Sequence, residues 1–234
     1  MILFFIVIVI ILYVLYYLKT HYHDYKYIEH SCKFSSNSVY NDSREAYAFD
    51  MNKNIEESSV FKKYKLDEKF VYFYNNLFKN VDKTEFGFAY SNGEIAKLYV
   101  NDNNNIYGIE KRGNKYSIRI YKPDAYFKKE ELDMFLGKDK STLLYTLFNI
   151  PREVVVYKKY DQNYNFKLNF YLIYLEKYLI HDYRTQIVTL LKTFKCKLDN
   201  IDKWLYKYSD YYLYWIAIGK KNDIQEVTFY YRKN

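Results

Sequence analysis

Cysteine is nearly absent from this sequence. The 234 residues include only 2 Cys, too few for the set of disulfides that holds a small secreted module together. The same count excludes a zinc ribbon, which needs four thiolates. Glycine and proline are also scarce, at 6 and 2 residues, so the chain is neither collagen-like nor a Pro/Gly-rich low-complexity protein. Its length suffices for one ordinary domain or two small ones.

Motifs of the common nucleotide and hydrolase families are missing as well. The six glycines form neither Gly-x-Gly-x-x-Gly nor Gly-x-x-x-x-Gly-Lys-Ser/Thr, which argues against a Rossmann or P-loop nucleotide enzyme. No serine stands in the Gly-x-Ser-x-Gly setting of a nucleophilic triad. The sequence therefore favours a protein that is not an enzyme, and we expect no cofactor.

Tyrosine is the residue type in excess. The chain contains 32 Tyr among 234 residues. A tyrosine side chain combines a large apolar ring with a polar hydroxyl, so it can fill a core, line a ligand cavity or form an adhesive surface. Phe, Ile, Asn and Lys are abundant too, and all five types have AT-rich codons. Codon bias therefore explains the tyrosines without a dedicated aromatic function.

A long apolar run opens the chain. Residues 2–18 contain no charged residue, Gly or Pro, and as a helix they would be about 25 Å long, near the lower limit for crossing a bilayer core. No basic residue precedes the run, the first Ala after it is Ala46, and no Gly occurs before Gly87, which favours an uncleaved anchor over a signal peptide. A buried helix is the remaining alternative.

Charges next to this run predict its orientation. Lys19, Lys26 and Lys33 follow the apolar residues, whereas only the α-amino group precedes them. The positive-inside rule then places the body in the cytosol. We therefore expect a single-pass membrane protein that contacts the lipid bilayer through residues 2–18.

The remaining sequence divides into a stalk and a folded body. Residues 1–18 are the expected anchor, and residues 19–65 have the Ser- and Asn-rich character of a polar juxtamembrane stalk. Helical and strand patterns then alternate over residues 66–234, with possible halves 66–150 and 151–234.

Periodicity predicts the elements of this body. An amphipathic helix is expected over residues 67–78, because apolar residues recur there at helical spacing behind Asp67 and Glu68. Further helices are expected from residue 130, at 141–149, 183–194 and 201–209. Strands are expected at 84–90, 94–100, 106–111, 115–122, 153–160, 164–174, 211–219 and 224–232, with Pro123 ending the first group.

The expected fold class is α+β, with an N-terminal transmembrane helix followed by an antiparallel sheet and packed helices. The stretches 70–100 and 204–231 share the order helix, aromatic strand, polar turn, strand. This shared order suggests a diverged helix-hairpin duplication, and the alternative is a common supersecondary arrangement without duplication.

Histidine suggests a metal site. Imidazole and thiolate groups bind zinc or copper, and four such residues follow the apolar run closely: His21, His23, His30 and Cys32. Their spacing matches no usual zinc module, and the alternative is a set of solvated histidines that gain charge in acid.

A second weak candidate is catalytic. His181 stands beside Asp182, and a histidine next to a carboxylate can act as a general base. Neighbouring residues point apart, however, so the partner must come from elsewhere, and Cys196 is one option. The alternative is that Cys196 is a small buried residue.

Positive charge is concentrated near the C-terminus. Residues 151–234 carry six of the eight excess positive charges of the chain. Several cations here are interleaved with aromatic residues, which is typical of a surface that binds nucleic acid or anionic lipid. The candidate binding residues are Arg184, Lys192, Lys195, Lys197, Trp204 and Lys207. The alternative is a solvated face.

An N-terminal apolar run before a body rich in Asn, Lys and Tyr resembles the uncharacterised membrane-anchored proteins of large DNA viruses with AT-rich genomes. The resemblance covers layout and composition and implies a virion-membrane or host-membrane protein. We thus expect a membrane-anchored, non-enzymatic protein whose α+β domain binds a macromolecular partner, with an unknown protein as the first expectation. An enzyme or small-molecule binder with an aromatic-lined cavity is the alternative, and nucleic-acid binding by residues 151–234 is a second one.

Overall fold

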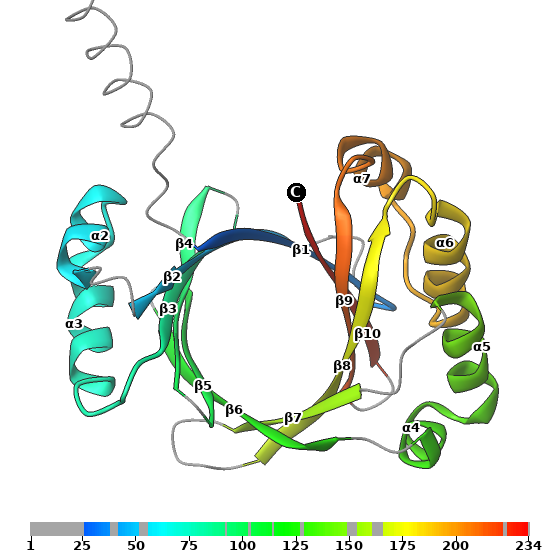
Figure 1. Cartoon of the computed structure of the whole chain (residues 1–234), viewed down its shortest axis with the longest axis horizontal. Coiled ribbons are helices and arrows are strands. Elements are labelled where there is room, and N and C mark those ends of the chain that lie inside the picture. The colour runs from blue at the N-terminus through cyan, green and yellow to red at the C-terminus, as the bar shows by residue number, and fades with distance from the viewer. Residues whose placement is uncertain are drawn as a thin grey trace, which may run out of the picture.

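The computed structural model describes residues 26–37, 42–51, 56–91, 93–102, 104–113, 115–126, 129–148, 154–160, 166–221 and 224–233. Within these ranges, ten strands form a closed antiparallel barrel (Figure 1). Each strand pairs with its neighbours in sequence, and the first strand pairs with the last to close the ring. His30 lies opposite Tyr231 in that closing pair.

The strands of the barrel are β1 (Tyr27–Ser35), β2 (Asp42–Asp50), β3 (Glu85–Ser91), β4 (Glu94–Asn101), β5 (Ile106–Arg112), β6 (Lys115–Tyr126), β7 (Val154–Tyr160), β8 (Phe166–Leu179), β9 (Tyr212–Lys221) and β10 (Ile224–Arg232). The helices are α2 (Glu57–Lys63), α3 (Glu68–Leu77), α4 (Lys129–Leu136), α5 (Lys138–Phe148), α6 (Arg184–Thr193) and α7 (Ile201–Lys207). All of these helices lie outside the barrel (Figure 1).

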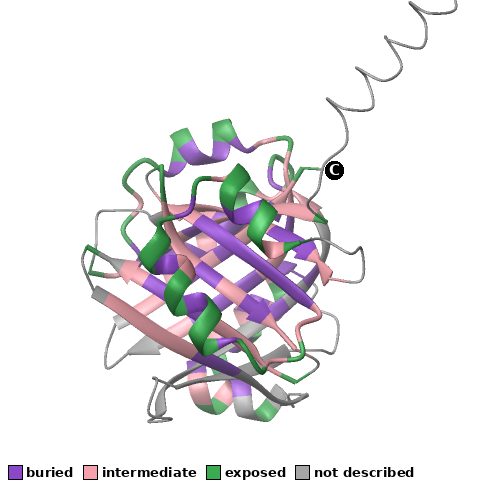
Figure 2. Ribbon diagram, turned by 90° about the vertical axis from the view of Figure 1, so that its left-hand side faces the viewer, coloured by how far each residue is buried: buried purple, intermediate pink, exposed green. Residues whose placement is uncertain are grey.

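Two helix layers cover opposite sides of the barrel, each over its own apolar core. On one side, α2 and α3 bury the outer faces of β2 to β5, including Phe49, Phe86 and Phe88, all three with no exposed surface. Burying a side chain of this size contributes about 2 kcal/mol. On the other side, α4 to α7 pack on the outer faces of β8, β9, β10 and β1. Figure 2 shows the exposed residues of α2 and α3 turned away from the buried strands beneath them.

The alternation of side chains along each strand separates these outer cores from the barrel interior. On β3, Phe86 and Phe88 pack under the helices, whereas Glu85, Gly87 and Ala89 occupy the other face. The outward positions are thus apolar and the inward positions are polar or small. This pattern leaves room inside the barrel.

Local sequence signals explain several elements. The Asp67 carboxylate accepts hydrogen bonds from the backbone N–H groups of Lys69 and Phe70, at 2.9 and 3.2 Å, and so caps α3 as its acidic start predicted. The predicted hairpin around residues 91–93 is confirmed, because β3 and β4 pair from Ser91 and Glu94 onward. Gly93 has a φ of 81° there, a value that favours glycine.

The predicted α+β fold class is wrong, because the sheet closes on itself and dominates the structure. The pattern of one strand does not reveal whether its sheet is open or closed, since closure depends on the pairing of β1 with β10. The predicted stalk also contains two barrel strands, β1 and β2. Finally, β6 continues through Pro123, which lies opposite Tyr157 of β7 just before a register shift.

The predicted membrane span, residues 2–18, lies outside the described residues. Across the described ranges, no helix is long and apolar enough to cross a bilayer. The longest of these helices, α5, has 11 residues, against the roughly 20 that a spanning helix needs. The prediction of a single-pass membrane protein with a signal anchor and a cytosolic body is corrected to this extent: none of the helices in the described ranges is a membrane anchor.

Candidate functional site

A cavity of about 410 Å³ lies against the inward faces of the strands. We call it the lumen cavity. On β1, β3 and β4 the cavity is lined by residues from alternate positions along the strand. On β3, the residues between these positions face the outer core instead. The lining residues are Tyr27, Glu29, Ser31, Arg44, Ala46, Glu85, Ala89, Lys97, Tyr99, Asn101, Ile106, Tyr121, Trp215, Tyr230 and Arg232.

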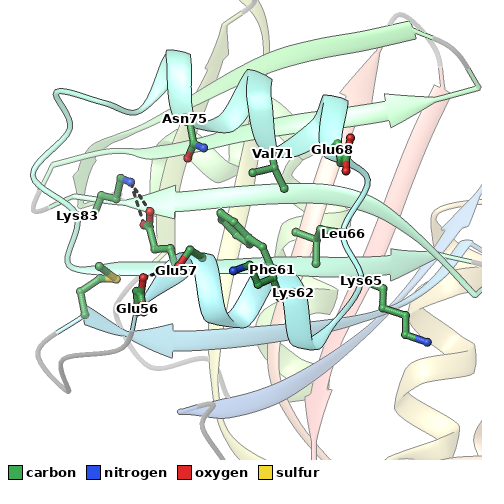
Figure 3. A pocket seen from close by; sticks show the side chains of 12 residues that line it. Glu56, Glu57, Phe61, Lys62, Lys65, Leu66, Glu68, Val71, Asn75 and Lys83 are labelled. Atoms are coloured by element: carbon green, nitrogen blue, oxygen red, sulfur yellow. Dashed lines mark hydrogen bonds and ion pairs between the residues drawn. The ribbon is translucent and has the colours of Figure 1, made fainter.

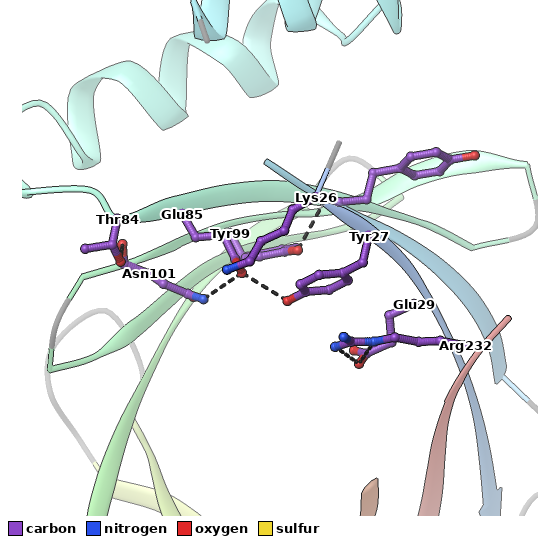
Figure 4. A network of polar contacts seen from close by, with 9 residues as sticks. Lys26, Tyr27, Glu29, Thr84, Glu85, Tyr99, Asn101 and Arg232 are labelled. Atoms are coloured by element: carbon purple, nitrogen blue, oxygen red, sulfur yellow. Dashed lines mark hydrogen bonds and ion pairs between the residues drawn. The ribbon is translucent and has the colours of Figure 1, made fainter. Parts of the chain in front are cut away.

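Glu85 is the centre of a polar network in this cavity (Figure 4). The residue is only 7% exposed. Its Oε1 atom accepts hydrogen bonds from the Tyr27 hydroxyl at 3.2 Å and from Asn101 Nδ2 at 2.9 Å. Lys26 Nζ lies 3.4 Å from Oε2. Donors from β4, from β1 and from the residue before β1 therefore converge on one buried carboxylate.

A second carboxylate, Glu29, is held by Arg232. Two guanidinium N–H groups donate to Glu29 Oε2, at 3.2 and 2.8 Å. Burial raises the pKa of the Glu29 carboxyl, and the Arg232 charge opposes that shift. The guanidinium also stacks 3.6 Å from the centre of the Tyr27 ring. Burial and the charge of Glu85 raise the pKa of the Tyr27 hydroxyl, so this hydroxyl stays a donor at neutral pH.

Two glycines make room for the longest side chains of the wall. Gly87 lies opposite Tyr99, and a Cβ on Gly87 would collide with the end of the Tyr99 ring. A Cβ on Gly108 would lie 2.7 Å from Lys97 Cε. The Lys97 ammonium lies 4.8 Å from the Tyr121 ring centre, within the range of a cation–π contact.

A second pocket lies outside the barrel, between α2 and α3 (Figure 3). We call it the outer groove. With a volume of about 660 Å³ it is larger than the lumen cavity, but it is more open to solvent. Lys83 Nζ lies 2.8 Å from Glu57 Oε2, and the Tyr74 hydroxyl donates to Glu57 Oε1 at 2.6 Å. These contacts connect α2 to α3 and to the segment before β3, so they stabilise the helix layer.

The predicted metal ligands do not form a cluster in the described structure. His21 and His23 lie outside the described residues. His30 lies on the outer face of β1 among three rings, with centroid distances of 5.7 Å to Tyr208, 5.2 Å to Tyr211 and 5.7 Å to Tyr231. Cys32 is buried in the core under α6 and α7. No group of three potential ligands occurs among the residues that the structure describes.

The predicted catalytic pair lies at the surface. His181 and Asp182 are both exposed in the turn between β8 and α6. Cys196 is instead buried, and burial raises the pKa of its thiol to about 11. A thiol of this kind is a poor nucleophile at neutral pH, so Cys196 fits the role of a small core residue.

The cations of the predicted basic surface are exposed, but the aromatic residue predicted with them, Trp204, is buried. Five cations are exposed on or near α6 and α7: Arg184, Lys192, Lys195, Lys197 and Lys207. Trp204, in contrast, is 5% exposed, and its indole N–H donates to the Tyr231 hydroxyl at 3.1 Å. The indole therefore cannot stack on a base. Nucleic-acid or anionic-lipid binding by this surface stays a prediction.

The sequence offered an aromatic-lined cavity only as an alternative and did not place it inside a barrel. The available signal was the alternation Glu85-Phe86-Gly87-Phe88-Ala89, in which a charged and two small residues share the face opposite two phenylalanines. Such a pattern indicates a strand whose aromatic face is covered and whose other face borders space. It does not reveal that the space is enclosed by ten strands.

No protein-family model and no curated protein matches the sequence. Seven chains of solved structures match the fold. One of them is the NotF prenyltransferase, with a TM-score of 0.51, 11% sequence identity, and coverage of 88% of this chain and 80% of that chain. At this identity the similarity concerns the fold alone.

Proposed function

We propose that this protein binds a small organic molecule in the lumen cavity. The observation that carries the proposal is a cavity of about 410 Å³ lined by both aromatic rings and charged groups. Ligand sites typically have this size and combine apolar walls with a few placed polar groups. The small-molecule alternative from the sequence is therefore better supported than a protein that binds a macromolecule.

The aromatic lining suggests a flat or unsaturated ligand. Five aromatic side chains border the cavity: Tyr27, Tyr99, Tyr121, Trp215 and Tyr230. Aromatic rings stack on flat ligands and bury large apolar areas with little loss of side-chain freedom. The ligand body is thus an aromatic ring system or an unsaturated chain.

The charged lining suggests that this ligand carries an anionic group. Arg44, Lys97 and Arg232 border the cavity together with two carboxylates, those of Glu29 and Glu85. The wall therefore has one formal positive charge in excess. A bound anionic group would balance this charge and accept charge-assisted hydrogen bonds from the guanidinium and ammonium groups.

Thermal unfolding with 1-naphthyl phosphate tests the proposal. A ligand at 100 times its Kd stabilises a protein by about 2.7 kcal/mol, so the Tm rises with ligand concentration. Ala46→Phe fills the lumen cavity and removes this shift. Ser58→Phe adds the same ring in the outer groove and leaves the shift unchanged. If the ligand still raises the Tm of Ala46→Phe but no longer raises that of Ser58→Phe, the proposal is rejected.

Prenyl transfer is a second candidate, because the structural neighbour NotF is a prenyltransferase. It is favoured by the tyrosine rings beside cations in the cavity, with Lys97 next to Tyr121 and Arg232 on Tyr27. Aromatic faces stabilise a positively charged carbon, and cations stabilise an anionic leaving group.

In such a transfer the C–O bond of a prenyl diphosphate breaks and its electron pair stays on the diphosphate. The acceptor's aromatic carbon then forms the new C–C bond and loses its proton to a carboxylate of the wall. Dimethylallyl diphosphate and 2-naphthol are suitable test substrates. Diphosphate release that is strongly reduced in Lys97→Met supports this candidate, and release no faster than in buffer rejects it.

A further inference from the structure

We infer that Asn101 forms, with Glu85, a subsite for a hydrogen-bond donor of the ligand. The inference deepens the proposed function and rests on it. The ligand class is an aromatic alcohol or amine, whose O–H or N–H group donates to the Asn101 amide oxygen. Both residues line the lumen cavity and lie directly opposite each other on β3 and β4.

The orientation of the Asn101 amide is set by Glu85. Asn101 Nδ2 donates to Glu85 Oε1 at 2.9 Å (Figure 4). A carboxylate only accepts hydrogen bonds, so the amide nitrogen, and not its oxygen, must face Glu85. The amide oxygen is thereby turned away from Glu85, so its hydrogen-bond donor must be another group.

This oxygen has no donor in the described structure. Asn101 Oδ1 is buried and lacks a hydrogen-bond partner among the described residues. Buried acceptors in proteins nearly always accept a hydrogen bond. A buried acceptor without a donor, on a residue that lines a cavity, therefore indicates that a ligand supplies the donor.

The backbone keeps Asn101 in place. Its carbonyl oxygen accepts hydrogen bonds from the Thr84 N–H at 2.9 Å and from the Thr84 hydroxyl at 3.2 Å. Asn101 ends β4 and pairs with Glu85, so the barrel ladder fixes its backbone, and the hydrogen bond to Glu85 holds its side chain. The free acceptor is thus built into the wall.

Glu85 acts here as a positioning residue. Its carboxylate already accepts hydrogen bonds from Tyr27, Asn101 and Lys26. Two of these partners, Tyr27 and Asn101, also line the cavity. The ring of a bound aromatic alcohol can then lie against Tyr27 while its hydroxyl reaches Asn101.

Calorimetric titration of the full chain with two matched probes tests the inference. 2-Naphthol can donate a hydrogen bond, whereas 2-methoxynaphthalene has nearly the same shape and cannot. We expect 2-naphthol to bind about tenfold more tightly, because the other probe leaves the buried acceptor unpaired. Asn101→Leu removes the acceptor and should reduce the ratio to less than about twofold.

Asn75→Leu is the matched control, because it makes the same change at an exposed residue of α3. It should keep the tenfold ratio between the affinities of the two probes. Equal affinities of the two probes for the unchanged protein would overturn the inference and leave the proposed function standing. Failure of both probes to bind would count against the proposed function itself. The ratio in the unchanged protein decides the question even if Asn101→Leu does not fold.

Discussion

The ring of Tyr99 lies over Gly87, its partner on the neighbouring strand. The Tyr99 hydroxyl donates to the Tyr47 carbonyl oxygen at 3.3 Å. A Cβ on Gly87 would collide both with this carbonyl and with the ring. The glycine therefore leaves the end of the Tyr99 ring the space that a Cβ would fill.

Adding a methyl group at Gly87 should destabilise the barrel. In Gly87→Ala the new Cβ meets backbone, which cannot move without disturbing the β2–β3 ladder, so we expect a loss of about 2–3 kcal/mol. Gly108→Ala is the matched control, because its Cβ would come too close only to the flexible end of Lys97, and the nearest backbone atom, the Leu98 carbonyl oxygen, lies 3.8 Å away. We expect that change to cost less than about 1 kcal/mol. Urea unfolding measures both, and equal losses would contradict the explanation.

Removing Arg232 should leave a buried charge unpaired. In Arg232→Met, Glu29 loses both of its hydrogen bonds to the guanidinium. Because both side chains keep about a fifth of their surface exposed, we expect a loss of about 2–3 kcal/mol, below that of a fully buried pair. The double variant Glu29→Gln, Arg232→Met should recover part of this loss. A double variant as unstable as the sum of both single variants would show that the two side chains do not interact.

His30 should make the protein sensitive to acid. Burial lowers the pKa of the His30 imidazole, with Lys207 acting in the same direction and Glu45 in the opposite one. The unfolded chain therefore takes up a proton near pH 6.5 that the folded protein takes up only at lower pH. The free energy of unfolding should fall as the pH drops below about 6.5.

His30→Phe isolates this contribution, since a phenyl ring fits among Tyr208, Tyr211 and Tyr231 but does not titrate. Between pH 6.5 and 5, the unfolding free energy of the variant should fall less steeply than that of the parent protein. His181→Phe, at an exposed histidine, is the matched control. Equal changes of slope in both variants would argue against a special role for the environment of His30.

Local features of this fold can be predicted from the sequence, whereas its closure cannot. The start of α3 at Asp67 and the turn between Ser91 and Glu94 depend on hydrogen bonds and backbone angles within a few residues. Closure depends on pairs such as His30 with Tyr231, which lie near opposite ends of the chain. The polar composition of residues 19–65 concealed β1 and β2, because these strands face the outer core and a polar lumen in alternation.

The lumen site illustrates the same limit. Glu85, Asn101 and Arg232 are separated in sequence and are typical of exposed strand positions when considered one by one. Only the closed register places them around one cavity. The predicted candidates, such as His181 and Asp182, are adjacent in sequence but lie at the surface. The resemblance to viral anchored proteins stays a prediction.

The two tryptophans of the chain allow the most direct test of ligand binding in the barrel. Trp215 lines the lumen cavity, whereas Trp204 belongs to α7 and is buried in the outer core. In Trp204→Phe, fluorescence reports on the cavity alone, and in Trp215→Phe it reports on the outer core. Titration with 1-naphthyl phosphate should quench Trp204→Phe in a saturable manner and leave Trp215→Phe nearly unchanged. Quenching of Trp215→Phe alone, or of neither variant, would contradict a ligand site inside the barrel.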